Sequence, residues 1–264
     1  MRRVGIPCIA LALALSLPAA SAQAARKIAS IATLPGYSPF CFYTDQANEE
    51  TWQTVKPGHD TPLFQGYSWD VVRASFQAVG YTLRLRIVPW ARAMYELKTG
   101  KVDLLFPAGR NAKRLKYMNY SQQPVNAVNF RVYVRQGEHV DWHGLNSLKG
   151  LTIGAARGWN FGNAWNKSSD FTKQQVGSIK QGFAMLDRKR IDGFAGYEVV
   201  WDYKLAKLGK AGKYDKLPPF GQSREYVTAL KSNPTGKQLL AAFDRGRQII
   251  EQNGTMARIK KRWR

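Results

Sequence analysis

The stretch LKTGKVDLLFPAGRNAKR, residues 97–114, ends a helical segment at Gly100, continues as an apolar strand over 102–106 and enters a basic turn that opens another helix. A second stretch, LDRKRIDGFA at residues 186–195, follows the same plan of helix end, basic turn, β-branched residue, aspartate and then small or apolar residues. Because the chain encodes one supersecondary unit twice, the sequence predicts two lobes of similar construction.

Strand and helix patterns alternate along the chain, which favours βαβ units and a mainly parallel sheet in each lobe. The expected strands cover residues 27–33, 81–88, 102–106, 128–135, 151–156 and 224–230. The expected helices cover 69–79, 90–100, a start near 157–165, and 236–254. The polar segment 44–65 is expected to form a long loop or hairpin that folds over the cleft.

This order predicts two α/β lobes joined by two crossing strands. Lobe 1 is assigned residues 25–128 and 222–264, and lobe 2 residues 129–221. In open α/β sheets a ligand binds beyond the carboxyl ends of the strands. The cleft between the lobes is therefore the expected binding site.

The N-terminus, residues 1–24, has the pattern of a secretory signal peptide. Arg2 and Arg3 precede an uncharged run from Ile6 to Leu17, and small residues follow at 20–22. That run is shorter than the ~20 apolar residues that a membrane helix needs. The mature chain is expected in the periplasm, with Cys41 as its only cysteine.

The chain is strongly basic, with 40 Lys and Arg against 18 Asp and Glu and a formal net charge of +22. Such a charge would ordinarily indicate nucleic-acid binding, but export argues against it, and no nucleic-acid partner is expected. The basic residues are spread along the chain, so most are interpreted as solvated surface. The terminal RIKKRWR segment is interpreted as an exposed helix end, with weak contact to an anionic membrane surface as the alternative.

Enzyme and cofactor motifs are absent from the sequence. It contains no Gly-x-Ser-x-Gly, His-Glu-x-x-His or Gly-x-Gly-x-x-Gly pattern and no phosphate-binding loop. His139 and His143 have a metal-like spacing, but their polar surroundings favour a solvated connector. Cys41 is interpreted as a buried thiol. No catalytic residue, metal or cofactor is expected.

Six short motifs, in order, resemble the periplasmic solute-binding proteins of the polar amino-acid ABC transporter type, the bacterial extracellular solute-binding proteins of family 3. They are YSPF (37–40), GYSWDVV (66–72), the 97–114 stretch, LKGLTIGAARG (148–158), RIDGFAGYE (190–198) and the closing segment 240–263. The resemblance covers nearly all of the mature chain and implies the two-lobed type II periplasmic-binding fold. It also implies a monomer that delivers a small anionic or zwitterionic solute to an inner-membrane ABC permease.

The resemblance assigns Arg114 to the ligand carboxylate, where a guanidinium can form two parallel charge-assisted hydrogen bonds. Gly109 would let the backbone approach the ligand without a Cβ. The other residues that it implies in ligand binding are Tyr37, Trp90, Trp159, Asn160, Phe161 and Tyr197. Backbone N–H groups at the helix starts near Arg114 and Trp159 are expected to complete the carboxylate site.

Tyr197 stands where many family members carry an aspartate for the ligand's α-ammonium, and Pro107 and Gly109 replace family Ser or Thr residues. A phenol supplies no negative charge at neutral pH. An organic acid or a modified compound is therefore as consistent with the sequence as a standard amino acid. Two other functions stay open: a periplasmic enzyme on the same scaffold, such as a cyclohexadienyl or arogenate-type dehydratase, and a cationic surface-binding protein.

Overall fold

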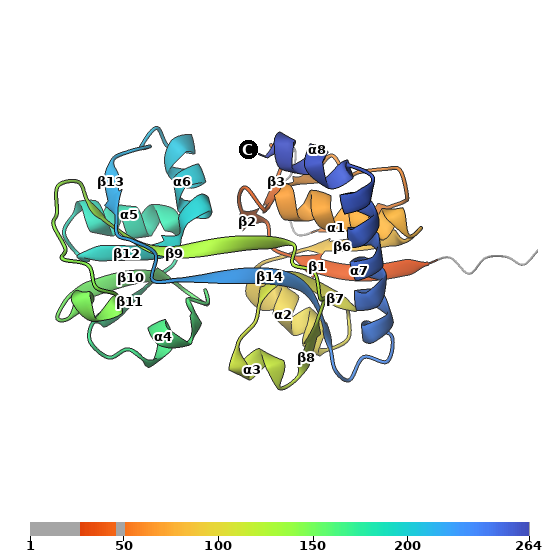
Figure 1. Ribbon diagram of the computed structural model, residues 1–264, viewed down its shortest axis with the longest axis horizontal. Helices are drawn as coiled ribbons and strands as arrows, with labels where there is room; N and C mark the ends of the chain where they lie inside the picture. Colours follow the sequence, from red (N-terminus) through yellow and green to blue (C-terminus); the bar gives the residue numbers. More distant parts are fainter. Residues whose placement is uncertain (1–26, 46–50, 264) are drawn as a thin grey trace, which may run out of the picture.

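Two lobes lie side by side in the computed structural model, which describes residues 27–45 and 51–263 (Figure 1). The predicted signal peptide, residues 1–24, falls outside the described residues. The fold confirms the expected α/β class, with a large mixed sheet flanked by helices. No helix within 27–45 and 51–263 is long and apolar enough to cross a membrane.

The sheet of lobe 1 has a parallel centre and antiparallel edges. β1 pairs in parallel with β6 on one side and β7 on the other, while β4 and β14 add antiparallel strands. β8 continues the sheet beside β14. The strands are β1 (Ile28–Thr33), β4 (Thr51–Val55), β6 (Thr82–Ile87), β7 (Leu104–Gly109), β8 (Met118–Tyr120) and β14 (Gly221–Leu230).

Helices cover both faces of this sheet, with α1 above and α2 below the strands in Figure 1. α1 packs on α7 and α8, and α2 packs on β1 and β7. The helices of lobe 1 are α1 (Tyr67–Ala78), α2 (Trp90–Lys98), α3 (Ala112–Leu115), α7 (Gly236–Gln252) and α8 (Thr255–Arg262). α1 buries Trp69, Val72 and Phe76, as their helical spacing predicts.

Lobe 2 repeats this design on a smaller scale. β10 pairs in parallel with β11 and β12, and β12 and β13 run antiparallel to β9. The strands are β9 (Asn126–Arg135), β10 (Thr152–Ala156), β11 (Thr172–Val176), β12 (Gly193–Tyr197) and β13 (Tyr214–Lys216). The helices are η1 (Leu145–Leu148), α4 (Gly162–Lys167), α5 (Ile179–Asp187) and α6 (Glu198–Lys207).

β9 and β14 run between the lobes (Figure 1). They pair antiparallel over 126–130 and 221–225, after which β9 enters lobe 2 and β14 enters lobe 1. The predicted lobe boundaries, at 128/129 and 221/222, fall within this paired segment. The two lobes therefore share one continuous 11-stranded sheet.

The aspartate of the repeated sequence stretch forms the same pair of hydrogen bonds in each lobe. In lobe 1, Oδ2 of Asp103 accepts from the backbone N–H of Ser30, while the Asp103 N–H donates to the Ser30 carbonyl. In lobe 2, Asp192 makes the same two bonds with Thr152. Each aspartate thus connects its own chain segment to the neighbouring parallel strand, and its role is structural.

Segment 44–65 differs from its expected form. Its β4 joins the edge of the main sheet beside β6, and β5 (Phe64–Gln65) pairs with β3 (Cys41–Tyr43), which in turn pairs with β2 (Gly36–Tyr37). Residues 51–65 line no part of the pocket between the lobes. For the described residues of this segment, the expectation of a flap over the cleft was wrong, because Trp52 packs instead against the arginines of β6.

Candidate functional site

A pocket of about 80 Å³ lies between the lobes, at the end of the paired crossing strands. This volume holds several waters or one small solute in their place. The lining residues come from both lobes and from β14: Leu34, Tyr37, Trp90, Pro107, Gly109, Arg114, Arg157, Gly158, Trp159, Asn160, Tyr197 and Glu225. The structure therefore brings together all the predicted site residues except Phe161.

Arg114 presents its guanidinium to the pocket from the short helix α3. Its Nη1 donates to the carbonyl of Gly109 at 3.0 Å, and its guanidinium carbon lies 5.4 Å from the centre of the Trp90 ring. These contacts hold the side chain in place while leaving other guanidinium donors available. Trp90 thus supports the arginine as well as lining the pocket.

One backbone N–H at each of the two helix starts beside the pocket is bonded within the protein. α3 has only four residues, and Oδ1 of Asn111 accepts from the Arg114 backbone N–H at 2.8 Å. In lobe 2, the side chain of Asn160 likewise accepts from the N–H of Gly162. These two backbone donors are therefore already used, whereas the Arg114 guanidinium keeps donors for an anion.

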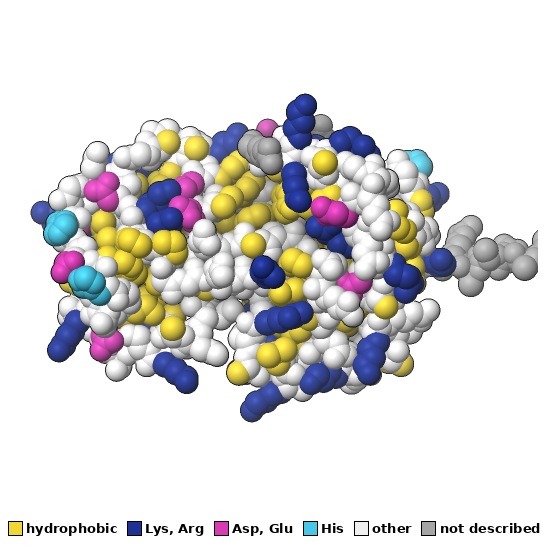
Figure 2. All heavy atoms as spheres, in the orientation of Figure 1, with side chains coloured by type: hydrophobic (Ala, Val, Ile, Leu, Met, Phe, Trp, Pro, Cys, Tyr) yellow, Lys and Arg dark blue, Asp and Glu magenta, His cyan; other side chains and the backbone are white. Residues whose placement is uncertain are grey.

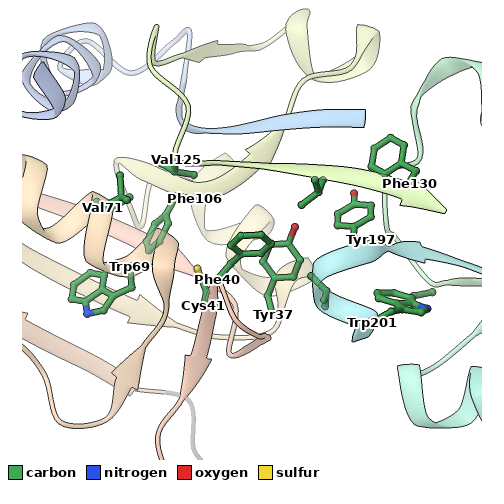
Figure 3. Packing of buried hydrophobic residues seen from close by; sticks show 14 of the residues in the cluster. Tyr37, Phe40, Cys41, Trp69, Val71, Phe106, Val125, Phe130, Tyr197 and Trp201 are labelled. Atoms are coloured by element: carbon green, nitrogen blue, oxygen red, sulfur yellow. The ribbon is translucent and has the colours of Figure 1, made fainter. Parts of the chain in front are cut away.

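Aromatic rings from both lobes meet at the pocket. Tyr37 of β2 lies edge-on to Trp159 at 5.5 Å and to Tyr197 at 6.1 Å between ring centres. Figure 3 shows Tyr37 approaching from lobe 1 and Tyr197 from lobe 2. Edge-to-face packing of this kind is favourable and excludes water from the walls.

Tyr197 takes the position where the family resemblance led us to look for an acid. Its hydroxyl donates to the carbonyl of Asn160 at 2.7 Å, and its side chain stacks on Phe130. Burial, with a smaller contribution from the Glu225 charge, raises the pKa of this phenol well above its ordinary value. Tyr197 is therefore a neutral wall of the pocket at physiological pH.

Glu225, which the sequence analysis did not select, places a carboxyl in the pocket. It is 6% exposed, and its Oε2 accepts from the Tyr37 hydroxyl at 2.8 Å. Burial raises the pKa of Glu225 to about 7, although hydrogen bonds from Tyr37 and Asn126 and the charge of Arg114 oppose that rise. Near neutral pH this group exists in both charge states.

Arg157 is the second charged residue of the pocket lining that the sequence analysis did not select. It directly follows β10 in lobe 2, and its backbone N–H donates to Val176. Its side chain is exposed, and within the described ranges its guanidinium forms no ion pair or hydrogen bond with the protein. A second positive charge thus faces the opening of the pocket.

Phe161 and Cys41 belong to the core. Phe161 is 3% exposed and packs on Phe130 and Trp165 of the lobe 2 core, so its side chain is not part of the pocket wall. Cys41 is fully buried, and burial raises the pKa of its thiol well above the ordinary value. Figure 3 shows Cys41 beside Phe40 within lobe 1.

Glu198, next to Tyr197 in sequence, begins α6 and forms an ion pair with Arg131, with Nε and Oε1 2.7 Å apart. Its carboxylate is therefore committed outside the pocket. His143 pairs with Asp141 on the surface. Within residues 27–45 and 51–263, no three His, Cys, Asp or Glu side chains cluster as metal ligands would.

Lysine and arginine side chains are spread over the face of both lobes seen in Figure 2, with few acidic side chains between them. Lys98 and Lys207 lie over the partly exposed rings of Tyr117 and Tyr203 in their own lobes. These contacts are consistent with a solvated basic surface.

A two-lobed α/β fold with crossing strands and a charged, aromatic pocket between the lobes defines a class of ligand-binding proteins. The chain belongs to the bacterial extracellular solute-binding proteins, family 3, whose family model matches residues 30–264. No curated protein sequence matches the chain.

Solved structures share this fold at low sequence identity. A histidine kinase sensor domain with similarity to periplasmic binding proteins is 17% identical, with a TM-score of 0.71, covering 90% of this chain and 96% of that one. The ligand-binding core of GluR0 from Nostoc punctiforme, in complex with L-glutamate, is 18% identical, with a TM-score of 0.68 and coverage of 89% and 98%. An ABC uptake transporter substrate-binding protein from Streptococcus pneumoniae with bound histidine is 16% identical, with a TM-score of 0.70 and coverage of 89% and 92%.

Proposed function

We propose that this chain is a periplasmic solute-binding protein that holds a small carboxylate-bearing solute in the interlobe pocket and delivers it to an inner-membrane ABC permease. Family membership supports binding of a solute outside the cytoplasm. The signal-peptide pattern of residues 1–24 supports export to the periplasm. Hinge closure of the lobes over the solute is the expected motion.

The guanidinium of Arg114 is the observation that carries this proposal. It lies in a pocket walled by aromatic rings and is held by Gly109 and Trp90. Such an environment strengthens a charge-assisted bond to a carboxylate, because little water competes for the donors. The carboxylate of a solute bound here would contact Arg114 in lobe 1, and the rest of the solute would contact Trp159 in lobe 2.

Delivery to a permease is supported by the description of the Streptococcus pneumoniae structure as a transporter component. The Nostoc punctiforme and Streptococcus pneumoniae structures hold amino acids. An amino acid or a related organic acid is therefore the solute class that we propose. Uptake of the labelled solute should fall in cells that lack this protein and return when it is restored.

A thermal-shift screen of amino acids and organic acids, followed by calorimetry on each hit, tests the proposed binding. Arg114→Ala should lower affinity by at least about 30-fold, since loss of a buried charge partner costs roughly 2 to 5 kcal/mol. Lys113→Ala is the matched control, because Lys113 is exposed and lines no part of the pocket. Equal binding by the two variants would refute the carboxylate contact.

An enzyme on the same scaffold is the alternative that Glu225 favours, because a carboxyl with a pKa of about 7 suits acid–base chemistry. We infer that the pocket binds its solute without converting it. NMR spectra of the solute before and after long incubation with purified protein distinguish the two functions. Unchanged spectra support binding alone, whereas a new product would establish turnover.

A further inference from the structure

Three charged side chains line the pocket: Arg114, Arg157 and Glu225. With Glu225 ionised, two guanidiniums and one carboxylate give this site a formal charge of +1. A solute that satisfied all three groups would carry two negative groups and one positive group.

Among the residues that the structure describes, Glu225 has no partner in an ion pair. Within the described residues it forms no ion pair within 4 Å, and its hydrogen bonds come from the neutral groups of Tyr37 and Asn126. Arg114 influences its charge, but the guanidinium donates to Gly109 instead. A buried carboxylate without a cation is costly, so the folded protein alone does not balance this charge.

Arg157, at the opening of the pocket, is likewise a charged side chain without an opposite charge beside it in the described residues. In the part of the chain that the structure describes, its guanidinium contacts no carboxylate and no aromatic face. Many other basic residues of lobe 2 have such partners, including Arg131, Arg135 and Lys216. A second acidic group on the solute would form an ion pair with Arg157, as the first would with Arg114.

We propose that Glu225 binds the ammonium group of the solute and Arg157 binds a second acidic group, so that the pocket selects small amino dicarboxylates. This inference rests on the proposed carboxylate contact of Arg114. The cation site then lies on crossing strand β14, where Glu225 provides the acid that Tyr197 does not.

The three groups together separate this solute class from simpler ones. A dicarboxylate without an amine would place negative charge near Glu225 with no cation between them. A neutral zwitterion would satisfy Arg114 and Glu225 but leave Arg157 to water. Because Arg157 is exposed, its contribution is smaller than that of buried Glu225.

Three probes isolate these contributions by calorimetry at pH 8, where Glu225 is mostly ionised. L-glutamate carries all three groups, glutarate lacks the amine, and L-glutamine replaces the second carboxylate with an amide. We expect L-glutamate to bind about 100-fold more tightly than glutarate, as for a buried charge pair. We expect a preference of about 3- to 5-fold over L-glutamine, as for an exposed pair.

Two variants test which residue causes the preference for L-glutamate over glutarate and which causes the preference over L-glutamine. Glu225→Gln keeps the shape of the side chain and should remove the preference for L-glutamate over glutarate. Arg157→Gln should remove the preference for L-glutamate over L-glutamine, whereas Arg188→Gln, an exposed arginine outside the pocket, should change neither ratio. Melting temperatures without ligand show that each variant is folded.

The outcomes distinguish this inference from the proposed function. If another carboxylate solute binds through Arg114 while L-glutamate and L-aspartate do not, the function stands and the amino dicarboxylate class is wrong. Unchanged preferences in Glu225→Gln would overturn the cation site in the same way. If no carboxylate solute binds, or Arg114→Ala binds unchanged, the proposed function itself fails.

Discussion

The hydroxyl of Tyr37 lies 2.8 Å from Oε2 of Glu225 and joins residues 188 positions apart in the chain. Tyr37 also packs against Trp159 and Tyr197 of lobe 2. One residue of a two-residue strand thus connects the acid of the pocket with the aromatic wall of the opposite lobe. The behaviour of Glu225 should therefore depend on Tyr37.

Binding of an ammonium-bearing solute should weaken as pH falls through about 7, the pKa of Glu225. Protonation removes the carboxylate charge, so affinity should drop about tenfold for each pH unit below that value. The described groups that interact with Glu225 include Tyr37, Asn126, Arg114, Tyr197 and the Cys41 thiol. Calorimetry with L-glutamate between pH 5.5 and 8.5 should give this profile, and a flat profile would contradict it.

Tyr37→Phe should move the midpoint of that profile to higher pH. The phenol O–H stabilises the ionised carboxylate, and its loss leaves burial to raise the pKa of Glu225 further. The control is Tyr95→Phe, because Tyr95 is 65% exposed and outside the pocket. An unchanged midpoint in Tyr37→Phe would show that the hydrogen bond does not stabilise the charge.

Glu225→Gln should stabilise the ligand-free protein at pH 8 while weakening its binding. The folded-state pKa of about 7 lies above the ordinary value for glutamate, so the folded state binds the proton more tightly than the unfolded state. The free energy of unfolding of the native protein therefore includes a contribution from protonated Glu225. This contribution is fully present at low pH and is lost as the pH rises from the ordinary pKa of glutamate through about 7, which lowers the free energy of unfolding by up to about 3 kcal/mol. Urea unfolding should show a clear gain for the variant at pH 8 and little difference near pH 4.5.

Tryptophan fluorescence should report solute binding through Trp159 and Trp90, which line the pocket. Trp159→Phe should remove most of the ligand-dependent change, because this indole contacts Tyr37 and Tyr197 at the lobe junction. Trp52→Phe should preserve it, since Trp52 lies on edge strand β4. A full response in Trp159→Phe would place the changing fluorophore elsewhere.

Gly246→Ala should destabilise lobe 1 by about 3 kcal/mol or more, because overpacked sites without room to relax are costly. A methyl group at this position of α7 would overlap the backbone carbonyl of Ser75 in α1. Arg245→Ala, at the exposed neighbouring position, should have a small effect. Comparable unfolding midpoints for the two variants would show that the helices can separate at little cost.

The sequence predicted the fold well where local chemistry dictates it. The repeated aspartates, Asp103 and Asp192, each follow a basic turn and precede an apolar strand, and both bond to the backbone of a neighbouring strand. Segment 44–65 was harder to predict, because the pairing of β4 with β6 depends on residues far along the chain. The turn residues within segment 44–65 do not indicate that β6 is the strand with which β4 pairs.

The pocket was predicted where the family resemblance supplied motifs, as for Tyr37 and Arg114. Glu225 was missed because residues 224–230 were interpreted only as a strand. The sequence does contain one signal for Glu225, an acidic residue directly before the largely apolar run YVTAL at 226–230. In the structure every residue of that run except Leu230 is buried. Arg157 was missed because one arginine among 40 basic residues has no distinguishing local feature.

Phe161, the residue before α4, was predicted to contribute its backbone N–H to the carboxylate site, and the position of its ring does not test that prediction. Phe161 follows Asn160 directly, yet the chain turns there, and Gly162 has a positive φ of 83°. That turn directs the ring into the lobe 2 core while Asn160 stays at the pocket. Only the backbone path separates the two neighbours.

Glu225 and Asn126 are register partners where the two crossing strands pair. If the lobes swing about this segment, a group near the pivot travels least. The carboxyl of Glu225 would then occupy nearly the same place in open and closed forms. The ammonium group of the solute would then stay at this carboxyl while residues of the two lobes closed around the rest of the solute.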